Sequence, residues 1–247
     1  SKTQIFKNDR NIRYFGAIHE MLKHEKRNIV IHDCSNIITI IHTGYSKDEV
    51  IRKNKGQRNI DLLIGELKKN NDNFDTFFYL AESYAINGDM ELGLYYALRA
   101  SNENKSRILG AKEKNYLNII KYMMGLKYPE SMIEKVCTDA IKLYPNYPDY
   151  YIILGNIYAK SNKNEDAIIM YEKALSVLEG NSVKGETQGA SLLLLIYKNL
   201  SELYYEKNDF NKAVHVLTII LKTDKYEFRY LNSVIKIFLN NGETEKN

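Results

Sequence analysis

The sequence predicts a mainly α-helical protein in which pairs of helices stack into a solenoid, preceded by a small β-rich segment. Three observations support this prediction. The 247 residues include only three prolines and 13 glycines, whereas β-sandwiches and barrels need turn-forming residues at short intervals. Beyond about residue 46, the apolar residues recur with the period of about 3.6 that is typical of helices. A short helical motif also occurs three times in this part of the chain.

The first 46 residues alternate strand-like runs with clusters of turn-forming residues. The β-branched and aromatic runs are residues 12–15, 29–32 and 37–41, and residues 23–28 and 33–36 lie between them. The chain begins at Ser1 and passes directly into another such run, residues 3–7. We therefore expect residues 1–46 to be the β-rich end of a larger domain, and the chain to be part of a longer protein.

Residues 47–72 are expected to form a connecting helix. Its apolar stripe has helical spacing and consists of Ile60, Leu63, Ile64 and Leu67. Ser46 and Glu49 match the capping box, in which a serine and a glutamate three positions later satisfy the first free N–H groups of a helix. The predicted helix covers roughly residues 48–69.

Residues 73–247 contain a repeated pattern. A leucine is followed by a small residue, and a tyrosine lies four positions after the leucine. A turn lies four positions after the tyrosine, at Gly88, Asn162 and Asn208, and a second helix follows. The leucine–tyrosine pairs are Leu80 and Tyr84, Leu154 and Tyr158, and Leu200 and Tyr204. Small residues such as Ala81 and Gly155 allow two helices to approach to about 8–10 Å. Because one helix pair cannot bury its own apolar stripe, neighbouring pairs must stack.

This pattern resembles the tetratricopeptide repeat (TPR), whose 34-residue unit is a pair of helices. Ala140 and Ala174, at equivalent positions of the second helix, are 34 residues apart, and Pro145 stands where the family has its inter-repeat proline. The resemblance implies a right-handed α-solenoid of four repeats plus a capping helix around Leu231 and Val234 over residues 73–247. Such an array has a concave surface to which peptides can bind.

Composition excludes several classes of function. The formal net charge is +4, which is too small for this length to indicate binding to nucleic acid or to an anionic membrane. No apolar run approaches the about 20 residues that cross a bilayer. Cys34 and Cys137 stand far apart and outside any metal-binding spacing. We expect both to be buried free thiols, as in the reducing cytoplasm.

Three short segments of the N-terminal part resemble another family. Residues 5–8, 14–20 and 42–45 are similar to the end of the GT-A-type catalytic domain of family 2 glycosyltransferases, which in a bacterial group of these enzymes runs directly into TPR repeats. The resemblance implies that the parent protein transfers a sugar from a nucleotide sugar with the help of Mg²⁺ or Mn²⁺. His19 and Glu20 are the candidate residues for the metal or donor site. A hydrogen-bonded histidine at the end of a strand is the structural alternative for His19.

The chain lacks the Asp-x-Asp motif that supplies the metal carboxylates in this family. The donor-binding half and the catalytic residues are therefore expected upstream of this chain. We expect the fragment by itself to bind no metal or nucleotide sugar and to be inactive.

Positions 2, 5, 9 and 12 of the first helix of each repeat are expected to line the concave surface. The peptide-binding candidates taken from these positions are Asp75, Phe78, Glu82, Asn118, Tyr122, Asn156, Lys198, Glu202 and Tyr205. This mildly acidic, amide-rich surface suits a neutral or basic peptide. The alternative is a solvated surface without a ligand.

The sequence supports two functions from different classes. The first is the C-terminal region of a glycosyltransferase, whose repeats dock a protein or peptide acceptor or pair two subunits. The alternative is a non-catalytic TPR adaptor or peptide-sensing binding module. The parent's upstream sequence discriminates between them, because a glycosyltransferase needs an Asp-x-Asp motif there.

Overall fold

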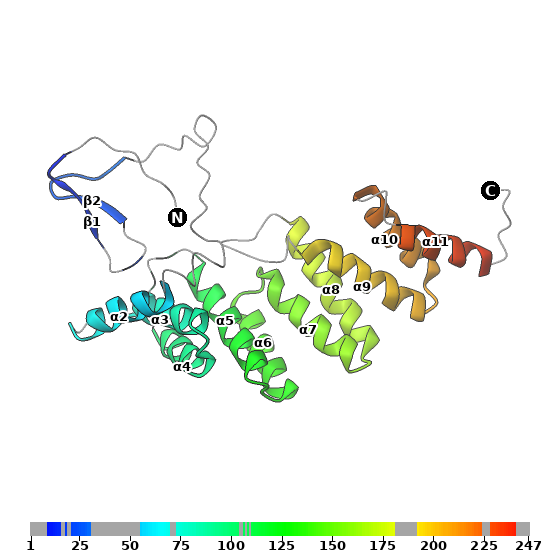
Figure 1. Ribbon diagram of the computed structural model, residues 1–247. Coiled ribbons are helices and arrows are strands. Elements are labelled where there is room, and N and C mark those ends of the chain that lie inside the picture. The colour runs from blue at the N-terminus through cyan, green and yellow to red at the C-terminus, as the bar shows by residue number, and fades with distance from the viewer. Residues whose placement is uncertain are drawn as a thin grey trace. The chain divides into compact units, whose positions relative to one another are not determined.

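The computed structural model describes residues 9–15, 18, 21–30, 55–69, 73–103, 106, 108, 110–180, 192–223 and 228–240. It is predominantly helical, as the sequence predicts (Figure 1). The chain divides into two compact units, Ser1–Ile108 and Leu109–Asn247. Within the described ranges, no helix is both long enough and apolar enough to cross a membrane. The predicted domain boundaries near residues 46 and 72 stay predictions, since residues 31–54 and 70–72 lie outside the described ranges.

The first unit contains a β-hairpin. Strands β1 (Ile12–Phe15) and β2 (Met21–His24) pair antiparallel, with Ile12 opposite His24. The prediction of β1 is confirmed. The predicted turn over residues 23–28 is partly wrong, because its first two residues belong to β2. The exposed side chains of Arg13 on β1 and Glu25, just after β2, pair at 3.0 Å.

Three helices complete the described part of this unit: α2 (Lys55–Leu67), α3 (Phe74–Ile86) and α4 (Met90–Ser101). They include the first predicted helix pair, α3 and α4, which pack closely because Ala81, Ala97 and Ala100 are fully buried between larger side chains. The predicted helix over residues 48–69 is helical from Lys55 to Leu67. Its predicted start, with the Ser46–Glu49 capping box, lies outside the described residues.

The second unit contains the remaining predicted helix pairs and the closing helix. The helices are α5 (Ala111–Gly125), α6 (Glu130–Leu143), α7 (Pro148–Lys160), α8 (Asn164–Glu179), α9 (Leu193–Glu206), α10 (Phe210–Thr223) and α11 (Phe228–Asn240). Each packs on the next in chain order. A continuous apolar core runs from α7 to α11, with Tyr171, Ala213 and Ile220 fully buried in it.

The turns inside the four helix pairs share one backbone motif. The second residue after the first helix has a positive φ in each turn: Gly88 (92°), Lys127 (58°), Asn162 (57°) and Asn208 (60°). The next N–H donates to a carbonyl five residues earlier, for example Asp89 to Tyr84 and Asp209 to Tyr204, both at 2.9 Å. This 6→1 bond is the Schellman helix ending, which favours glycine or asparagine at the positive-φ position. The turns predicted at Gly88, Asn162 and Asn208 are confirmed.

Lys127 is the unexpected member of this set, because lysine gains nothing from the left-handed conformation. We expect Lys127→Gly to raise the free energy of unfolding by about 0.5–1 kcal/mol, since the exposed side chain contributes little and the backbone strain disappears. Urea unfolding measures the change. Lys127→Ala keeps the Cβ and is the control, expected to stay within about 0.5 kcal/mol of the unmodified chain. Equal stabilities of the glycine and alanine variants would show that the turn is unstrained.

Candidate functional site

The residues predicted to bind metal or donor, His19 and Glu20, lie outside the described residues. Cys34, expected to be a buried thiol, also lies outside them. Over the ranges that the structure describes, no three His, Cys, Asp or Glu side chains come together in a way that could hold a metal ion. Cys137 is buried as a free thiol, as predicted. Burial, followed by the nearby Glu134 carboxylate, raises its pKa to about 12, so Cys137 remains protonated and is not a nucleophile.

The three predicted binding residues of the first unit are unequally accessible. Phe78 is buried and stacks on Phe74, with ring centroids 5.7 Å apart. Asp75 is partly buried and accepts a hydrogen bond from Ser106 Oγ at 2.9 Å. Glu82 is partly exposed. Phe78 is therefore part of the core of this unit, which corrects its assignment to an open peptide surface.

The predicted residues of the second unit divide in the same way. Asn118 and Tyr122 on α5 are buried, each with about 8% of its surface exposed, and a ligand cannot reach them as the structure stands. Asn156 on α7 and Glu202 and Tyr205 on α9 are exposed, while Lys198 is partly exposed. The accessible candidates therefore gather on α7 and α9. We call the exposed sides of these two helices around Asn156 and Glu202 the α7–α9 face.

A hydrogen-bonded network joins α7, α8 and α9 at this face. The Tyr171 hydroxyl on α8 donates to Asn156 Oδ1 at 2.6 Å. Asn199 Nδ2 on α9 donates to the same hydroxyl at 2.9 Å and lies 3.5 Å from Asn156 Oδ1. Three polar groups from three consecutive helices thus hold one another in place where the two repeats meet.

Asn156 is predicted from the sequence, but its partners are not. The repeat pattern predicts Tyr171 only as an apolar core residue, and Asn199 lies one position beyond the expected binding position of Lys198. The ring of Tyr171 is fully buried, and burial raises the pKa of its hydroxyl, although the hydrogen bond from Asn199 opposes this shift. A polar tip on a fully buried ring must find a partner. The signal in the sequence that could have revealed the network is the presence of an asparagine on each of the two helices beside Tyr171, Asn156 on α7 and Asn199 on α9.

Gly155 makes room for this tyrosine. A Cβ placed on Gly155 would lie 2.7 Å from Cε1 and 2.8 Å from Cδ1 of the Tyr171 ring. Since real Cβ atoms do not approach other carbons so closely, only glycine fits at this position of α7 without a shift of the ring. The small residue in the repeat pattern therefore also determines where the Tyr171 hydroxyl emerges.

Polar pairs also clamp consecutive repeats together. The Tyr158 hydroxyl on α7 donates to Glu134 Oε1 on α6 at 2.8 Å. Tyr204 on α9 donates in the same way to Glu172 Oε1 on α8 at 2.6 Å. The two tyrosines occupy the same repeat position. They therefore have two roles, packing with their rings and linking to the preceding repeat with their hydroxyls.

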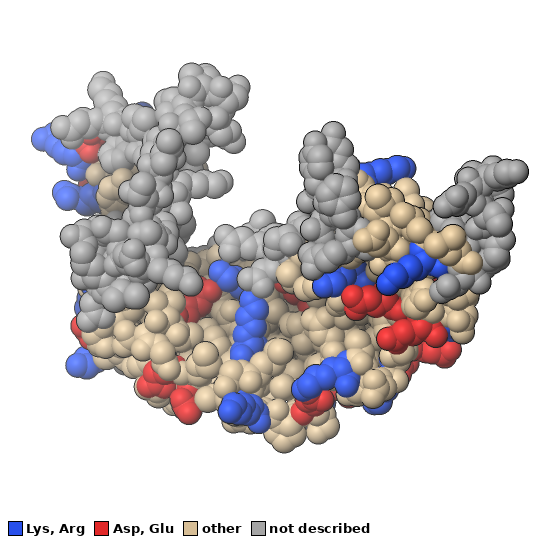
Figure 2. Space-filling view, turned by 45° about the vertical axis from the view of Figure 1, so that its right-hand side comes forward, with Lys and Arg blue, Asp and Glu red and all other residues tan. Residues whose placement is uncertain are grey.

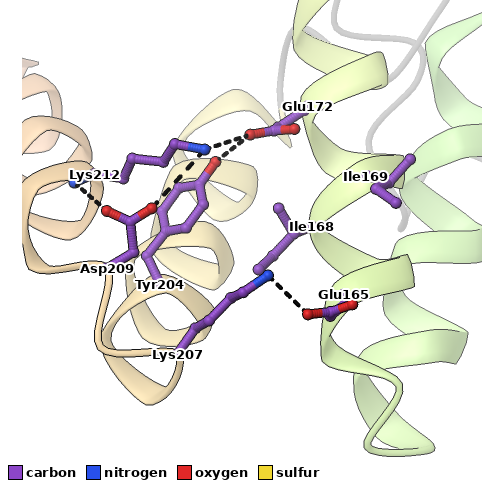
Figure 3. A pocket seen from close by; sticks show the side chains of 8 residues that line it. All are labelled: Glu165, Ile168, Ile169, Glu172, Tyr204, Lys207, Asp209 and Lys212. Carbon is purple, nitrogen blue, oxygen red and sulfur yellow. Dashed lines mark hydrogen bonds and ion pairs between the residues drawn. The ribbon is translucent and has the colours of Figure 1, made fainter.

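A pocket of about 210 Å³ lies between α8, α9 and α10 (Figure 3). Its charged groups point toward one another: Lys207 Nζ lies 2.8 Å from Glu165 Oε1, and Lys212 Nζ lies 3.6 Å from Glu172 Oε1. Asp209 Oδ1 accepts the Lys212 backbone N–H at 3.2 Å. Small-molecule sites are usually about 300–1,000 Å³ and offer unsatisfied polar groups. This pocket is smaller and its charges are paired, which is typical of a joint between repeats.

The surface charges form no single-sign field on the helical face shown in Figure 2. Basic and acidic side chains are interspersed over the described helices in that view. Binding to nucleic acid depends on neutralising many phosphates with clustered cations. This face therefore gives no support for a nucleic-acid partner.

No family model and no curated protein matches the chain. Solved structures are similar to it at low sequence identity. MamA has a TM-score of 0.54 and 18% identity, with 78% of this chain and 100% of that chain covered. The C-terminal part of a TPR repeat-containing protein from Cytophaga hutchinsonii has a TM-score of 0.57 and 13% identity, with 81% of this chain and 72% of that chain covered. YrrB, described as a TPR protein with an unusual peptide-binding site, has a TM-score of 0.51 and 11% identity, with 75% of this chain and 87% of that chain covered. The helix pairs of this chain have the tetratricopeptide-repeat fold.

Proposed function

We propose that this chain is a protein-interaction module that binds an extended peptide segment on the α7–α9 face. The observation that carries the proposal is the set of accessible polar groups there, in which the exposed Asn156 and the partly exposed Asn199 are both hydrogen-bonded to the buried Tyr171. The charged groups that line the pocket between α8, α9 and α10, in contrast, are paired with one another. The TPR fold supports the proposal, and one structure with this fold, YrrB, is described as having a peptide-binding site.

The charges of the α7–α9 face favour a neutral or basic segment. Glu202 is exposed, and no described residue pairs with its carboxylate. Lys198, one turn earlier on α9, is less exposed. Asp149 on α7 is buried, with 3% of its surface exposed, and contributes no open charge. A peptide with a basic residue near Glu202 is therefore expected to bind better than an acidic one.

Selection from a library of random 12-residue peptides tests this function. We expect the 247-residue chain to enrich peptides with basic residues, and Glu202→Lys to weaken a selected peptide about fivefold in a fluorescence-anisotropy titration, because an attraction becomes a repulsion. Glu179→Lys makes the same charge change at the exposed end of α8 and is the matched control. The failure to enrich any peptide, or equal losses in both variants, would contradict the proposal.

Glycosyl transfer by the protein that contains this chain stays a second, separate prediction. It rests on the resemblance of residues 5–8, 14–20 and 42–45, and the candidate site residues His19 and Glu20 lie outside the described residues. The divalent metal, the nucleotide sugar and the pairing of two subunits also stay predictions. Peptide binding by the repeats is compatible with either function, because repeats present an acceptor to an enzyme in the first case and link two proteins in the second.

A further inference from the structure

Helix α11 is apolar on two sides. Tyr230 and Ile237 pack into the core that runs from α7 to α11. Leu231, Ile235 and Leu239 lie four residues apart, so they form a stripe along another side of the helix. These three side chains are 41%, 45% and 58% exposed, and we call them the α11 stripe. A helix that only closes an array needs a polar outer side, and the outer side of α11 is apolar.

The repeat pattern shows what kind of element covers such a stripe. Val234, Phe238 and Gly242 have the same spacing as the leucine, the tyrosine and the turn residue of the other repeats, so α11 has the pattern of a first helix. Ile235 then stands at the position of Gly155, which faces the Tyr171 ring on the second helix of its own repeat. The α11 stripe is therefore the side of a first helix that a second helix covers in the other repeats.

The residues that follow α11 cannot supply this second helix. Residues 241–247 read Asn-Gly-Glu-Thr-Glu-Lys-Asn and include no apolar side chain. A helix that packs on an apolar stripe needs an apolar stripe of its own, with a residue at every third or fourth position. The cover of the α11 stripe must therefore come from outside these residues.

The α11 stripe is complementary to a second copy of itself. Two helices joined by a short turn run antiparallel, and two copies of α11 that cross a twofold axis run antiparallel as well. With the axis at Ile235, the two isoleucines meet, and Leu231 of each copy meets Leu239 of the other. A stripe that is symmetric about its central residue thus buries all of its side chains in a single contact.

We infer that the chain forms a twofold homodimer in which α11 of each copy takes the place of a second helix on the α11 stripe of the other. This inference goes beyond peptide binding and does not depend on it. It assigns a surface to the pairing of two subunits that the sequence predicts. Each dimer presents two α7–α9 faces, so a partner with two binding segments gains avidity.

The size of the contact sets the expected affinity. α11 has 13 residues and is about 20 Å long, so two such helices bury less than the about 1,200–2,000 Å² of a stable interface. We therefore expect a weak dimer, with a Kd of about 10–100 µM. Sedimentation equilibrium of the 247-residue chain from about 1 µM to about 1 mM measures this Kd. A chain that stays monomeric at the highest concentration would overturn the inference.

Two matched substitutions locate the contact. Leu239→Asp places a carboxylate against the apolar stripe of the other copy and is expected to weaken the dimer at least about thirtyfold. Leu143→Asp makes the same change near the end of α6 and is expected to change Kd less than about twofold. The two leucines are 58% and 57% exposed, so both variants are expected to keep the circular dichroism of the unmodified chain at about 1 µM, where all three are monomers. Equal losses of affinity would overturn the inference.

Cross-linking distinguishes the antiparallel pairing from other arrangements. One chain carries Leu231→Cys and another Leu239→Cys, both with Cys34→Ser, and Cys137 is buried and protonated. In the antiparallel dimer, residue 231 lies opposite residue 239 of the other copy, whereas two residues 231 lie about 12 Å apart along the helix. A short bifunctional maleimide is therefore expected to link the mixture at least about fivefold faster than either chain alone. Faster linking within each single chain type would overturn the antiparallel pairing.

The results separate this inference from the proposed function. If the chain dimerises through the α11 stripe but enriches no peptide, the dimer stands and the proposed function fails. If the chain stays monomeric but binds vesicles of anionic lipid, and Leu239→Asp releases it, then the α11 stripe is a membrane surface and the dimer is overturned.

Discussion

Gly155→Ala is expected to lower the free energy of unfolding of the second unit by about 2–3 kcal/mol. The added Cβ would lie 2.7–2.8 Å from two carbons of the Tyr171 ring, and this ring is fully buried and cannot swing into solvent. Overpacking a well-filled core costs about this much, which far exceeds the small gain in helix propensity from glycine to alanine. Urea unfolding followed by circular dichroism measures the loss.

Two further variants show whether the clash is the cause. Gly65 is also a helical glycine, on α2, but a Cβ there meets nothing within 4 Å. Gly65→Ala is therefore expected to stabilise the chain by about 0.5–1 kcal/mol. Tyr171→Leu removes the ring, so adding Gly155→Ala to it should cost almost nothing more. If Gly155→Ala is as harmless alone as beside Tyr171→Leu, the close approach of α7 to α8 is not a constraint.

The same glycine shows how far the fold could be predicted from the sequence. The repeat pattern identified Gly155 and Ala81 as small residues between packed helices, and it identified Gly88, Asn162 and Asn208 as turns. These features are local and recur at fixed spacing, so one sequence is sufficient to find them. Lys127 adopts the same turn conformation with an unsuitable residue. The local propensity of lysine does not predict this conformation.

The binding surface was less predictable because burial depends on neighbouring repeats. The positions predicted to be concave included Phe78 and Asn118, which are buried, and Asn156 and Glu202, which are exposed. Position within a helix specifies a face, but it does not say what covers that face. Asn199 was missed because its importance comes from Tyr171, which is 28 residues earlier and on another helix. Such a contact is visible only after the helices have been placed.

The second large effect expected is unfolding at high pH. Burial raises the pKa of Tyr158 to about 12, with a further contribution from its hydrogen bond to Glu134. Burial likewise raises the pKa of Tyr150, Tyr171 and Tyr204 above the ordinary value of 10. Near pH 11 the unfolded chain loses these phenolic protons while the folded chain keeps them. The stability linked to the raised pKa values is therefore fully present below about pH 10 and is lost as the pH rises through about 12.

The difference in tyrosine pKa between the folded and unfolded chains sets how steeply the free energy of unfolding falls with pH. Each phenol that is protonated only in the folded chain adds up to about 1.4 kcal/mol per pH unit to the slope of unfolding free energy against pH. The doubly substituted variant with Tyr158→Phe and Tyr204→Phe retains both rings without these protons. We expect it to be less stable than the unmodified chain at pH 7, because the hydrogen bonds to Glu134 and Glu172 are lost.

Between about pH 10 and 12 the double variant is expected to lose stability less steeply than the unmodified chain, so that the two curves of unfolding free energy converge. Urea titrations at half-unit steps of pH measure both curves. Tyr205→Phe removes the hydroxyl of an exposed tyrosine in place of those that are hydrogen-bonded to Glu134 and Glu172, and it is the matched control. Parallel curves for the double variant and the unmodified chain would mean that the two hydroxyls contribute hydrogen bonds alone. Converging curves would show that the hydrogen bonds between repeats depend on protonated tyrosines. A phenolate beside Glu134 or Glu172 would lose its hydrogen bond and place two negative charges next to each other.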